Sequence, residues 1–151
     1  MISKILLMRG RSLASTLVRC QTRSNFAHSA LLYPDGRTII ESYPGHGVRK
    51  KLLHDWDDVV AFSLHGVTSE QWRRAYAFAE AQIGKPYDWY SVLCFLTRDK
   101  PPKNDNWFCS ELTMAAMQAG GVNLLARIPP YKVYPGMLAY SPLLIQCPPV
   151  K

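Results

Sequence analysis

One cysteine stands where a helix is predicted to begin, in the stretch Trp107-Phe108-Cys109-Ser110-Glu111-Leu112, after a turn-rich run over residues 100–106. A cysteine attacks a carbonyl group only as the thiolate, and the unpaired N–H groups and positive dipole of a helix N-terminus favour that form. The position therefore favours a nucleophilic role for Cys109, provided that a base lies nearby in space. Taken alone, a cysteine at such a position is more often a small buried apolar residue.

His28 is the strongest candidate for that base. The chain has four histidines, at positions 28, 46, 54 and 65. His28 lies inside a predicted strand over residues 26–33, where its rotamer can be locked, and rigid elements hold catalytic geometry better than loops do. A strand histidine considered singly is more often structural, so a third group that orients the imidazole must also be found.

The orienting group is predicted from a β-hairpin. Pro34-Asp35-Gly36 is a turn signal, and residues 38–42 form the next predicted strand. If residues 33–36 are a four-residue turn, Leu32 faces Arg37 and His28 faces Glu41, on the same side of the sheet. Glu41 could then hold the second imidazole nitrogen and fix its tautomer. A shift of one residue would move Glu41 to the other face, and a simple ion pair is the structural alternative.

The elements that position these residues follow from hydrophobic periodicity and turn signals. Strands are predicted over residues 5–8, 26–33, 38–42, from 48 onward and over 58–64, and helices over 12–23, 68–83 and 109–118. The first helix places Leu13, Leu17 and Cys20 on one apolar face, and the last is apolar nearly all round and is expected to be buried. The apolar segment 89–96 is expected to be a buried helix or strand, and the tail from residue 128 is expected to wrap the surface.

The order of strands and then helices predicts an α+β fold in which an antiparallel sheet packs against helices and the nucleophile-bearing helix is buried. We expect a single domain over residues 1–151, because the chain is long enough for one core and too short for two. The composition, 48% hydrophobic and 19% charged, is typical of a globular protein and excludes a disordered chain.

The net charge of +7 favours loose contact with anionic polymers or membrane surfaces. Much of it lies early in the chain, at Lys4, Arg9, Arg11, Arg19, Arg23, Arg37, Arg49, Lys50 and Lys51. A solvated basic surface is the simpler interpretation, and specific nucleic-acid recognition is not expected.

The four cysteines, at positions 20, 94, 109 and 147, form no C-x-x-C pair and show no metal-ligand spacing with the histidines. We therefore expect reduced thiols, no disulfide framework, no metal and no other cofactor. The first apolar run is interrupted by Arg9-Gly10-Arg11, which is not typical of a signal peptide, and no run reaches membrane-spanning length. The expectation is a cytoplasmic protein, or one released on lysis if it is a phage product.

Four short stretches in a fixed order carry a family resemblance: residues 22–30 around His28, residues 40–48 around Glu41, Gly84-Lys85-Pro86-Tyr87-Asp88-Trp89, and Phe108-Cys109-Ser110-Glu111-Leu112. Together they resemble the permuted NlpC-like papain-fold family, which includes the bacterial YiiX/YebB-like cysteine hydrolases and is related to the lecithin:retinol acyltransferase group. In the permuted arrangement the histidine strand precedes the nucleophile helix, as it does in this chain. The resemblance extends over nearly the whole sequence.

The resemblance implies a triad with Cys109 as nucleophile, His28 as base and Glu41 as the polar third member. It also implies that Tyr87 lines the substrate site, although packing of its turn is an equal alternative. His46, in a glycine-flanked loop, and Ser110, beside the nucleophile, are further candidates for substrate lining. For His46, an ordinary surface position is the simpler explanation.

A hydrolase of this kind would cleave an amide (peptide) or ester bond through a thioacyl-enzyme. Cell-wall peptides are the first substrate class that the resemblance implies. Lipid amides or esters, by hydrolysis or acyl transfer, are the second. The alternative from a different class is a non-catalytic binding module that uses the basic face.

Overall fold

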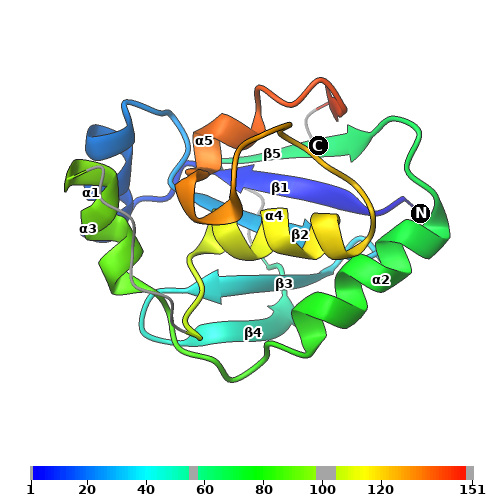
Figure 1. The fold of residues 1–151 in the computed structure, drawn as a ribbon, viewed down its shortest axis with the longest axis horizontal. Helices are drawn as coiled ribbons and strands as arrows, with labels where there is room; N and C mark the ends of the chain where they lie inside the picture. Colours follow the sequence, from blue (N-terminus) through cyan, green and yellow to red (C-terminus); the bar gives the residue numbers. More distant parts are fainter. Residues whose placement is uncertain (1, 55–57, 98–104, 149–151) are drawn as a thin grey trace.

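The computed structural model describes residues 2–54, 58–97 and 105–148, with residues 94–97 described by their backbone alone. Within these residues, six strands form one antiparallel sheet in the order β4-β3-β2-β1-β5-β6 (Figure 1). The strands are β1 Lys4–Met8, β2 His28–Leu32, β3 Thr38–Tyr43, β4 Gly47–Leu52, β5 Val59–Leu64 and β6 Leu144–Gln146.

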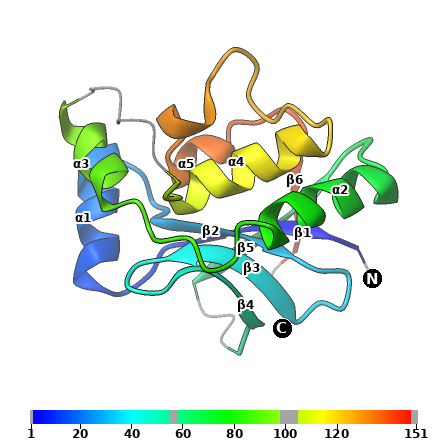
Figure 2. The ribbon, with the colours of Figure 1, turned by 60° about the horizontal axis from the view of Figure 1, so that its bottom comes forward.

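The helices gather on one face and at one end of this sheet. They are α1 Leu13–Thr22, α2 Ser69–Glu80, α3 Trp89–Thr97, α4 Cys109–Ala119, the 3-10 turn η1 Pro130–Lys132 and the short α5 Pro135–Leu138. Helices α2 and α4 cover one face, whereas α1 and α3 pack side by side at the end where β1 finishes and β2 starts (Figure 2). The predicted α+β class, with helices against an antiparallel sheet, is confirmed.

Alternation along the central strands fills two apolar clusters. Ile5 and Leu31 belong to the cluster that includes α2 and α4, and their neighbours Leu6 and Ala30 belong to a second cluster on the other face. Central strands buried on both faces explain the nearly continuous apolar runs in the sequence. Helix α4 is buried along most of its length, as its composition predicts.

The predicted register of the β2–β3 hairpin was wrong by two residues. Leu32 faces Ile39 and not Arg37. The Tyr33 N–H donates to Thr38 O at 2.8 Å, so the four-residue turn covers residues 34–37 and starts one residue later than expected, and Asp35 accepts backbone hydrogen bonds within it. A shift of two residues returns every side chain to its original face, so His28 and Glu41 still share one side, as diagonal neighbours.

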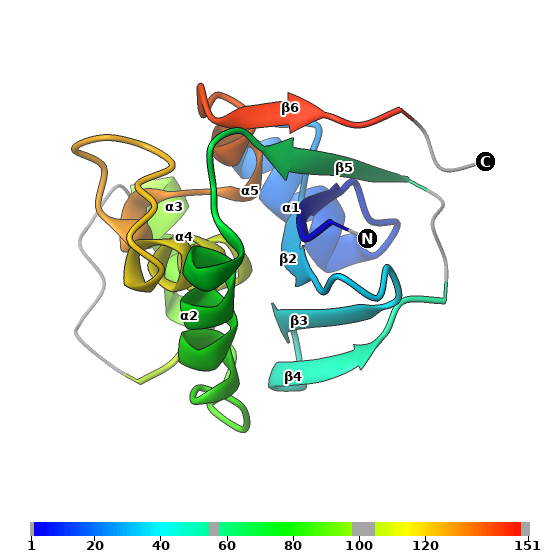
Figure 3. The same cartoon turned by 90° about the vertical axis from the view of Figure 1, so that its right-hand side faces the viewer.

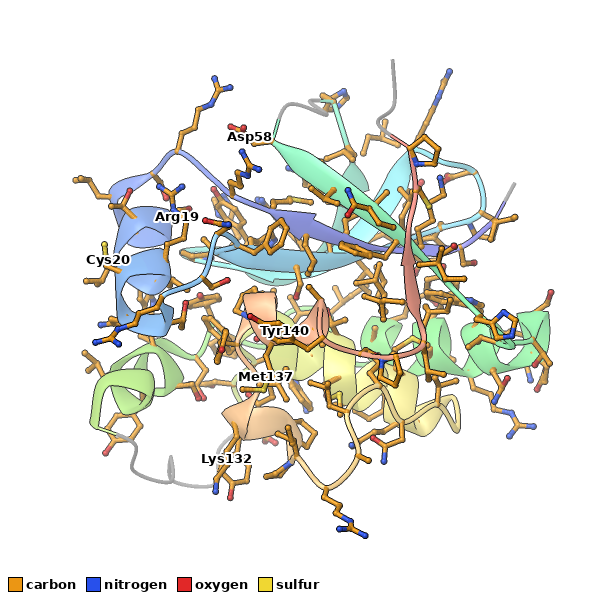
Figure 4. All side chains as sticks on the ribbon, turned by 90° about the horizontal axis from the view of Figure 1, so that it is seen from above. Arg19, Cys20, Asp58, Lys132, Met137 and Tyr140 are labelled. Atoms are coloured by element: carbon orange, nitrogen blue, oxygen red, sulfur yellow. The ribbon has the colours of Figure 1, made fainter. Side chains whose placement is uncertain are left out.

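The predicted apolar face of α1 was also wrong. Val18 is the buried residue of the helix, whereas Leu13, Leu17 and Cys20 are exposed, and Cys20 lies on the outer side of α1 (Figure 4). The reason is that α1 lies at the end of the sheet and does not cover a face of it. Its partner α3 has the same character, since the start of this predicted buried segment exposes large apolar side chains, among them Trp89.

The proline-rich tail does more than wrap the surface. Its strand β6 pairs with β5 and forms an edge of the sheet (Figure 3), which the sequence analysis did not predict. Val133 and Leu138 are fully buried in the core, so the tail is part of the packed structure. No helix in the described part of the chain is long and apolar enough to cross a membrane.

Candidate active site

His28 and Glu41 form a buried pair at the helical end of the sheet. Nε2 of His28 donates to Glu41 Oε2 at 2.6 Å, and the glutamate is only 2% exposed. The other carboxylate oxygen accepts hydrogen bonds from Arg49, from Nε at 3.0 Å and from Nη2 at 2.9 Å. Each oxygen of Glu41 therefore has its own nitrogen donor, which is the condition under which a buried carboxylate is tolerated.

Two opposing effects act on the Glu41 carboxyl group. Burial alone raises its pKa, but the hydrogen bonds and charges of His28 and Arg49 outweigh burial and lower the pKa to about 2. Glu41 is consequently ionised throughout the neutral range and fixes a negative charge behind the imidazole.

Sequence reasoning missed Arg49. It faces Glu41 directly in the β3–β4 pairing, and its guanidinium lies 4.5 Å from the centre of the Tyr43 ring. That ring meets the His28 imidazole edge-on, with centroids 5.5 Å apart. The sequence did contain a signal for Arg49, because a tight turn that pairs Tyr43 with Gly47 places Arg49 opposite Glu41.

Cys109 is the first residue of α4, as predicted. The N-cap residue Phe108 makes no side-chain hydrogen bond to the first turn of the helix. The helix is tied to β2 because the Thr113 hydroxyl donates to Cys109 O at 3.1 Å and also hydrogen-bonds the hydroxyl of Ser29, again at 3.1 Å. Since Ser29 follows His28 in the chain, these contacts hold the start of α4 against the histidine.

The Cys109 thiol is the second polar neighbour of the His28 ring. Burial alone lowers the histidine pKa, but the charge of Cys109 and hydrogen bonds with Cys109 and Glu41 outweigh it and raise the pKa to about 10. Because Nε2 is bonded to Glu41, Nδ1 is the ring nitrogen left for the thiol. The arrangement thus favours an imidazolium ion between the Glu41 carboxylate and the thiol.

A cleft of about 360 Å³ opens over this site between α1 and α3. Its lining is mostly apolar, and among the described residues only His28 adds a charged side chain to it: Ser12, Ala14, Ser15, Leu17, Val18, Ala27, His28, Tyr43, Pro44, Tyr87, Trp89, Val92 and Leu93. Cys109 is 1% exposed and packs directly beneath, in one cluster with Val18, Ala27 and Tyr87. His28 also lines a second hollow of about 260 Å³, which contains the Arg11–Asp58 ion pair.

Tyr87 lies in the wall of the cleft. A bridge to Trp107 holds its backbone, and the Asp88 N–H donates to Trp107 O at 3.1 Å, so the segment before α3 is bound to the segment before α4. Burial, and then the charge of Cys109, raise the pKa of the Tyr87 phenol, which keeps its hydroxyl protonated.

The other two predicted lining residues lie elsewhere. His46 is exposed on the turn between β3 and β4 and contacts the Tyr43 ring, with centroids 5.9 Å apart, without lining the cleft itself. Ser110 is fully buried and donates to Val133 O. One residue along a helix is a turn of about 100°, so Ser110 points into the protein where Cys109 points to His28.

No family model and no curated protein matches the sequence. The fold is similar to that of the metalloprotein YiiX from Escherichia coli O157:H7, described as DUF1105, with a TM-score of 0.75 and 18% sequence identity. The match covers 99% of this chain and 97% of that chain. At this identity the likeness concerns the fold alone, and it agrees with the YiiX-like part of the resemblance in the sequence.

YiiX is described as a metalloprotein, which raises the question whether this chain could hold a metal ion. Among the described residues, no three His, Cys, Asp or Glu side chains are grouped as metal ligands would be. The side chains around Cys109 are instead paired with one another, since Glu41 is shared between His28 and Arg49. Among the described residues, this donor set does not fit a metal site.

Proposed function

We propose that this protein is a cysteine hydrolase that cleaves an amide or ester bond, with Cys109 as nucleophile, His28 as its proton partner and Glu41 as the residue that orients His28. The observation that carries the proposal is the buried His28–Glu41 pair, 2.6 Å apart, beside a thiol at a helix start. A histidine with a purely structural role does not require both an ionised carboxylate and a cysteine as partners of its two ring nitrogens, whereas a catalytic histidine does.

In the first half of the reaction, the Cys109 thiolate attacks the carbonyl carbon and a C–S bond forms. The His28 imidazolium then gives its proton to the leaving nitrogen or oxygen, and the C–N or C–O bond breaks. The backbone N–H groups at the start of α4 are the donors for the oxyanion in this proposal. The product of this half is a thioester on Cys109.

In the second half, the neutral imidazole takes a proton from water, which attacks the thioester. The acid is released, and the thiolate and imidazolium are restored. If an acyl acceptor replaces water, the same steps describe acyl transfer. The histidine strand precedes the nucleophile helix, which supports a permuted papain-like arrangement for this fold.

The cleft bears on the choice between the two substrate classes. Cell-wall peptides carry charged groups, whereas the lining of the cleft is mostly apolar and, among the described residues, has His28 as its only charged side chain. This favours an acyl group of a lipid amide or ester over a wall peptide. Digestion of purified peptidoglycan, compared with hydrolysis of long-chain amide and ester substrates, decides between the two.

Labelling by a fluorescent electrophile near neutral pH tests the catalytic thiol. We expect a fast labelling phase that Cys109→Ala and His28→Ala both remove. Cys20→Ala is the matched control, because Cys20 is exposed on α1, and it should keep the fast phase. If Cys109→Ala labels as fast as the wild type, Cys109 is not the reactive thiol. The alternative of a binding module predicts ligand binding that Cys109→Ala leaves intact, without turnover by the wild type.

A further inference from the structure

We infer that the mouth of the cleft, formed by α1 and the start of α3, docks on an anionic lipid surface from which the acyl substrate enters. The inference rests on the proposed function, and it deepens it by naming where the substrate lies. It is argued from an exposed apolar rim, from the charge around that rim and from the chemistry of the cleft.

The apolar rim consists of five exposed side chains, which are Leu13 and Leu17 of α1 and Trp89, Tyr90 and Leu93 of α3. Three of them, Leu17, Trp89 and Leu93, line the cleft together, and Leu13 is 91% exposed one helical turn before Leu17. Single exposed apolar residues are common, but a group around a cleft mouth indicates an interaction surface. Tryptophan and tyrosine favour the boundary between water and lipid.

Positive charge flanks α1, which forms one wall of the cleft. Arg9 and Arg11 precede α1, Arg19 lies in it and Arg23 caps its end, while residues 1–34 contain no aspartate or glutamate. In the part of the chain that the structure describes, Asp58 pairs with Arg11, and no carboxylate pairs with Arg9, Arg19 or Arg23. A helix with exposed leucines and flanking arginines is typical of proteins that lie on anionic membranes.

Lipid explains the whole surface better than the other candidates. A soluble anionic polymer would account for the arginines but would leave the apolar rim in contact with charge. A second copy of the chain would have to place two basic segments face to face. An anionic lipid surface accepts the apolar side chains at the acyl boundary and the arginines at the head groups.

The geometry also suits entry of the substrate. The rim leads into the apolar cleft, and the Val18–Ala27–Tyr87 cluster at its inner wall covers the Cys109 thiol. An acyl chain that leaves the lipid through this mouth stays in apolar surroundings until its carbonyl group reaches the site.

Vesicle flotation of the Cys109→Ala protein tests the docking, because this variant cannot turn over substrate. We expect binding to phosphatidylglycerol vesicles at about 0.1 M salt and little binding to phosphatidylcholine alone. Leu13→Glu and Tyr90→Glu, which lie outside the cleft lining, should each weaken partitioning about ten-fold. Arg9→Gln and Arg23→Gln should each weaken it about five-fold.

Leu52→Glu and Lys51→Gln are the matched controls, since both residues are exposed on β4 at the end of the β3–β4 ladder away from Tyr43. They should bind as the parent protein does. The inference is overturned if the vesicles do not bind, if the controls weaken binding as much as the rim variants, or if Leu13→Glu binds normally, which would indicate a purely electrostatic contact with any polyanion. Self-association that Leu13→Glu abolishes without lipid would indicate a second copy instead. If the wild type hydrolyses soluble esters but the protein does not bind the vesicles, only this inference is contradicted. If the protein binds the vesicles but the wild type hydrolyses no ester or amide, the proposed function is contradicted instead.

Discussion

At the scale of single residues, the site is a series of paired polar groups. The Cys109 thiol, the His28 imidazolium, the Glu41 carboxylate and the Arg49 guanidinium follow one another, and the carboxylate lies between two cations. Burying the charge of Glu41 alone would be strongly unfavourable, whereas its two cationic partners offset that cost. Arg49 therefore completes the balance that allows Glu41 to stay ionised in the interior.

Glu41→Gln tests the role of that carboxylate. The variant keeps a hydrogen-bond acceptor for His28 but loses the negative charge, so the His28 pKa should fall from about 10. Because the proposed acid is the imidazolium, the alkaline limb of the kcat/KM profile should move to lower pH. Lowered activity with an unmoved limb would contradict the electrostatic role. Glu80→Gln, which removes an exposed partner of Lys50, is the control and should leave the profile unchanged.

At the scale of the elements, the predictions succeeded where local chemistry decides and failed where tertiary placement decides. The helix start at Cys109 and the face shared by His28 and Glu41 followed from turn signals and the two-residue period of a strand. The register itself could not be predicted, because Asp35 stabilises a turn that starts one residue later by accepting from the Arg37 and Thr38 N–H groups. The wrong register did not change the face that His28 and Glu41 share, because a shift of two residues returns each side chain of a strand to the same face.

The error for α1 has a different cause. A stripe containing Leu13 and Leu17 is normally directed at the core, and nothing within the segment shows that its helix lies at the end of the sheet. Strand β6 was missed for a related reason, because three residues of a proline-rich tail carry too little pattern, and only the exposed edge of β5 selects them. Both features depend on neighbours that are distant in the sequence.

Gly47→Ala tests how the β3–β4 turn positions the cleft wall. Gly47 has a φ of +67°, and a Cβ there would lie 2.2 Å from Lys85 O, which accepts a hydrogen bond from the Val48 N–H at 2.9 Å. The substitution should displace the segment that leads to Tyr87, lower the free energy of unfolding by about 3 kcal/mol and slow hydrolysis.

Gly45→Ala is the matched control for the same turn. Gly45 has a similar φ of +77° but no atom within 4 Å of the added Cβ, so it should cost only about 1 kcal/mol and leave hydrolysis unchanged. Urea unfolding and the rate of ester hydrolysis measure both effects. Equal losses in the two variants would show that backbone strain, and not the contact with Lys85, is the cause.

At the scale of the whole molecule, the sheet brings together residues far apart in the chain. His28 and Glu41 come from adjacent central strands, while Cys109 arrives on a helix that follows all but the last described strand. Helix α4 packs against both β2 and β3, so the proposed nucleophile and its partners share a buried region. The cleft walls, by contrast, belong to α1 and α3 at the end of the sheet. The fold thus separates the proposed catalytic residues from the surface proposed to select the substrate.

The buried charge of Glu41 should make the stability of the whole protein depend on acid. Its pKa is about 2 in the folded protein against an ordinary 4.5, so its contribution is fully present above pH 4.5 and is lost as the pH falls toward 2. Glu41→Gln should therefore be less stable than the wild type above pH 4.5, by about 3 kcal/mol, and the difference should shrink as the pH is lowered through this window. Urea unfolding across the acid range measures the effect.

Glu70→Gln is the control, because Glu70 is exposed to solvent and its ion pairs with Arg73 and Arg74 are screened, so its curve of stability against pH should run parallel to that of the wild type. A constant difference between Glu41→Gln and the wild type at every pH would mean that Glu41 stabilises the fold by packing and not by its negative charge.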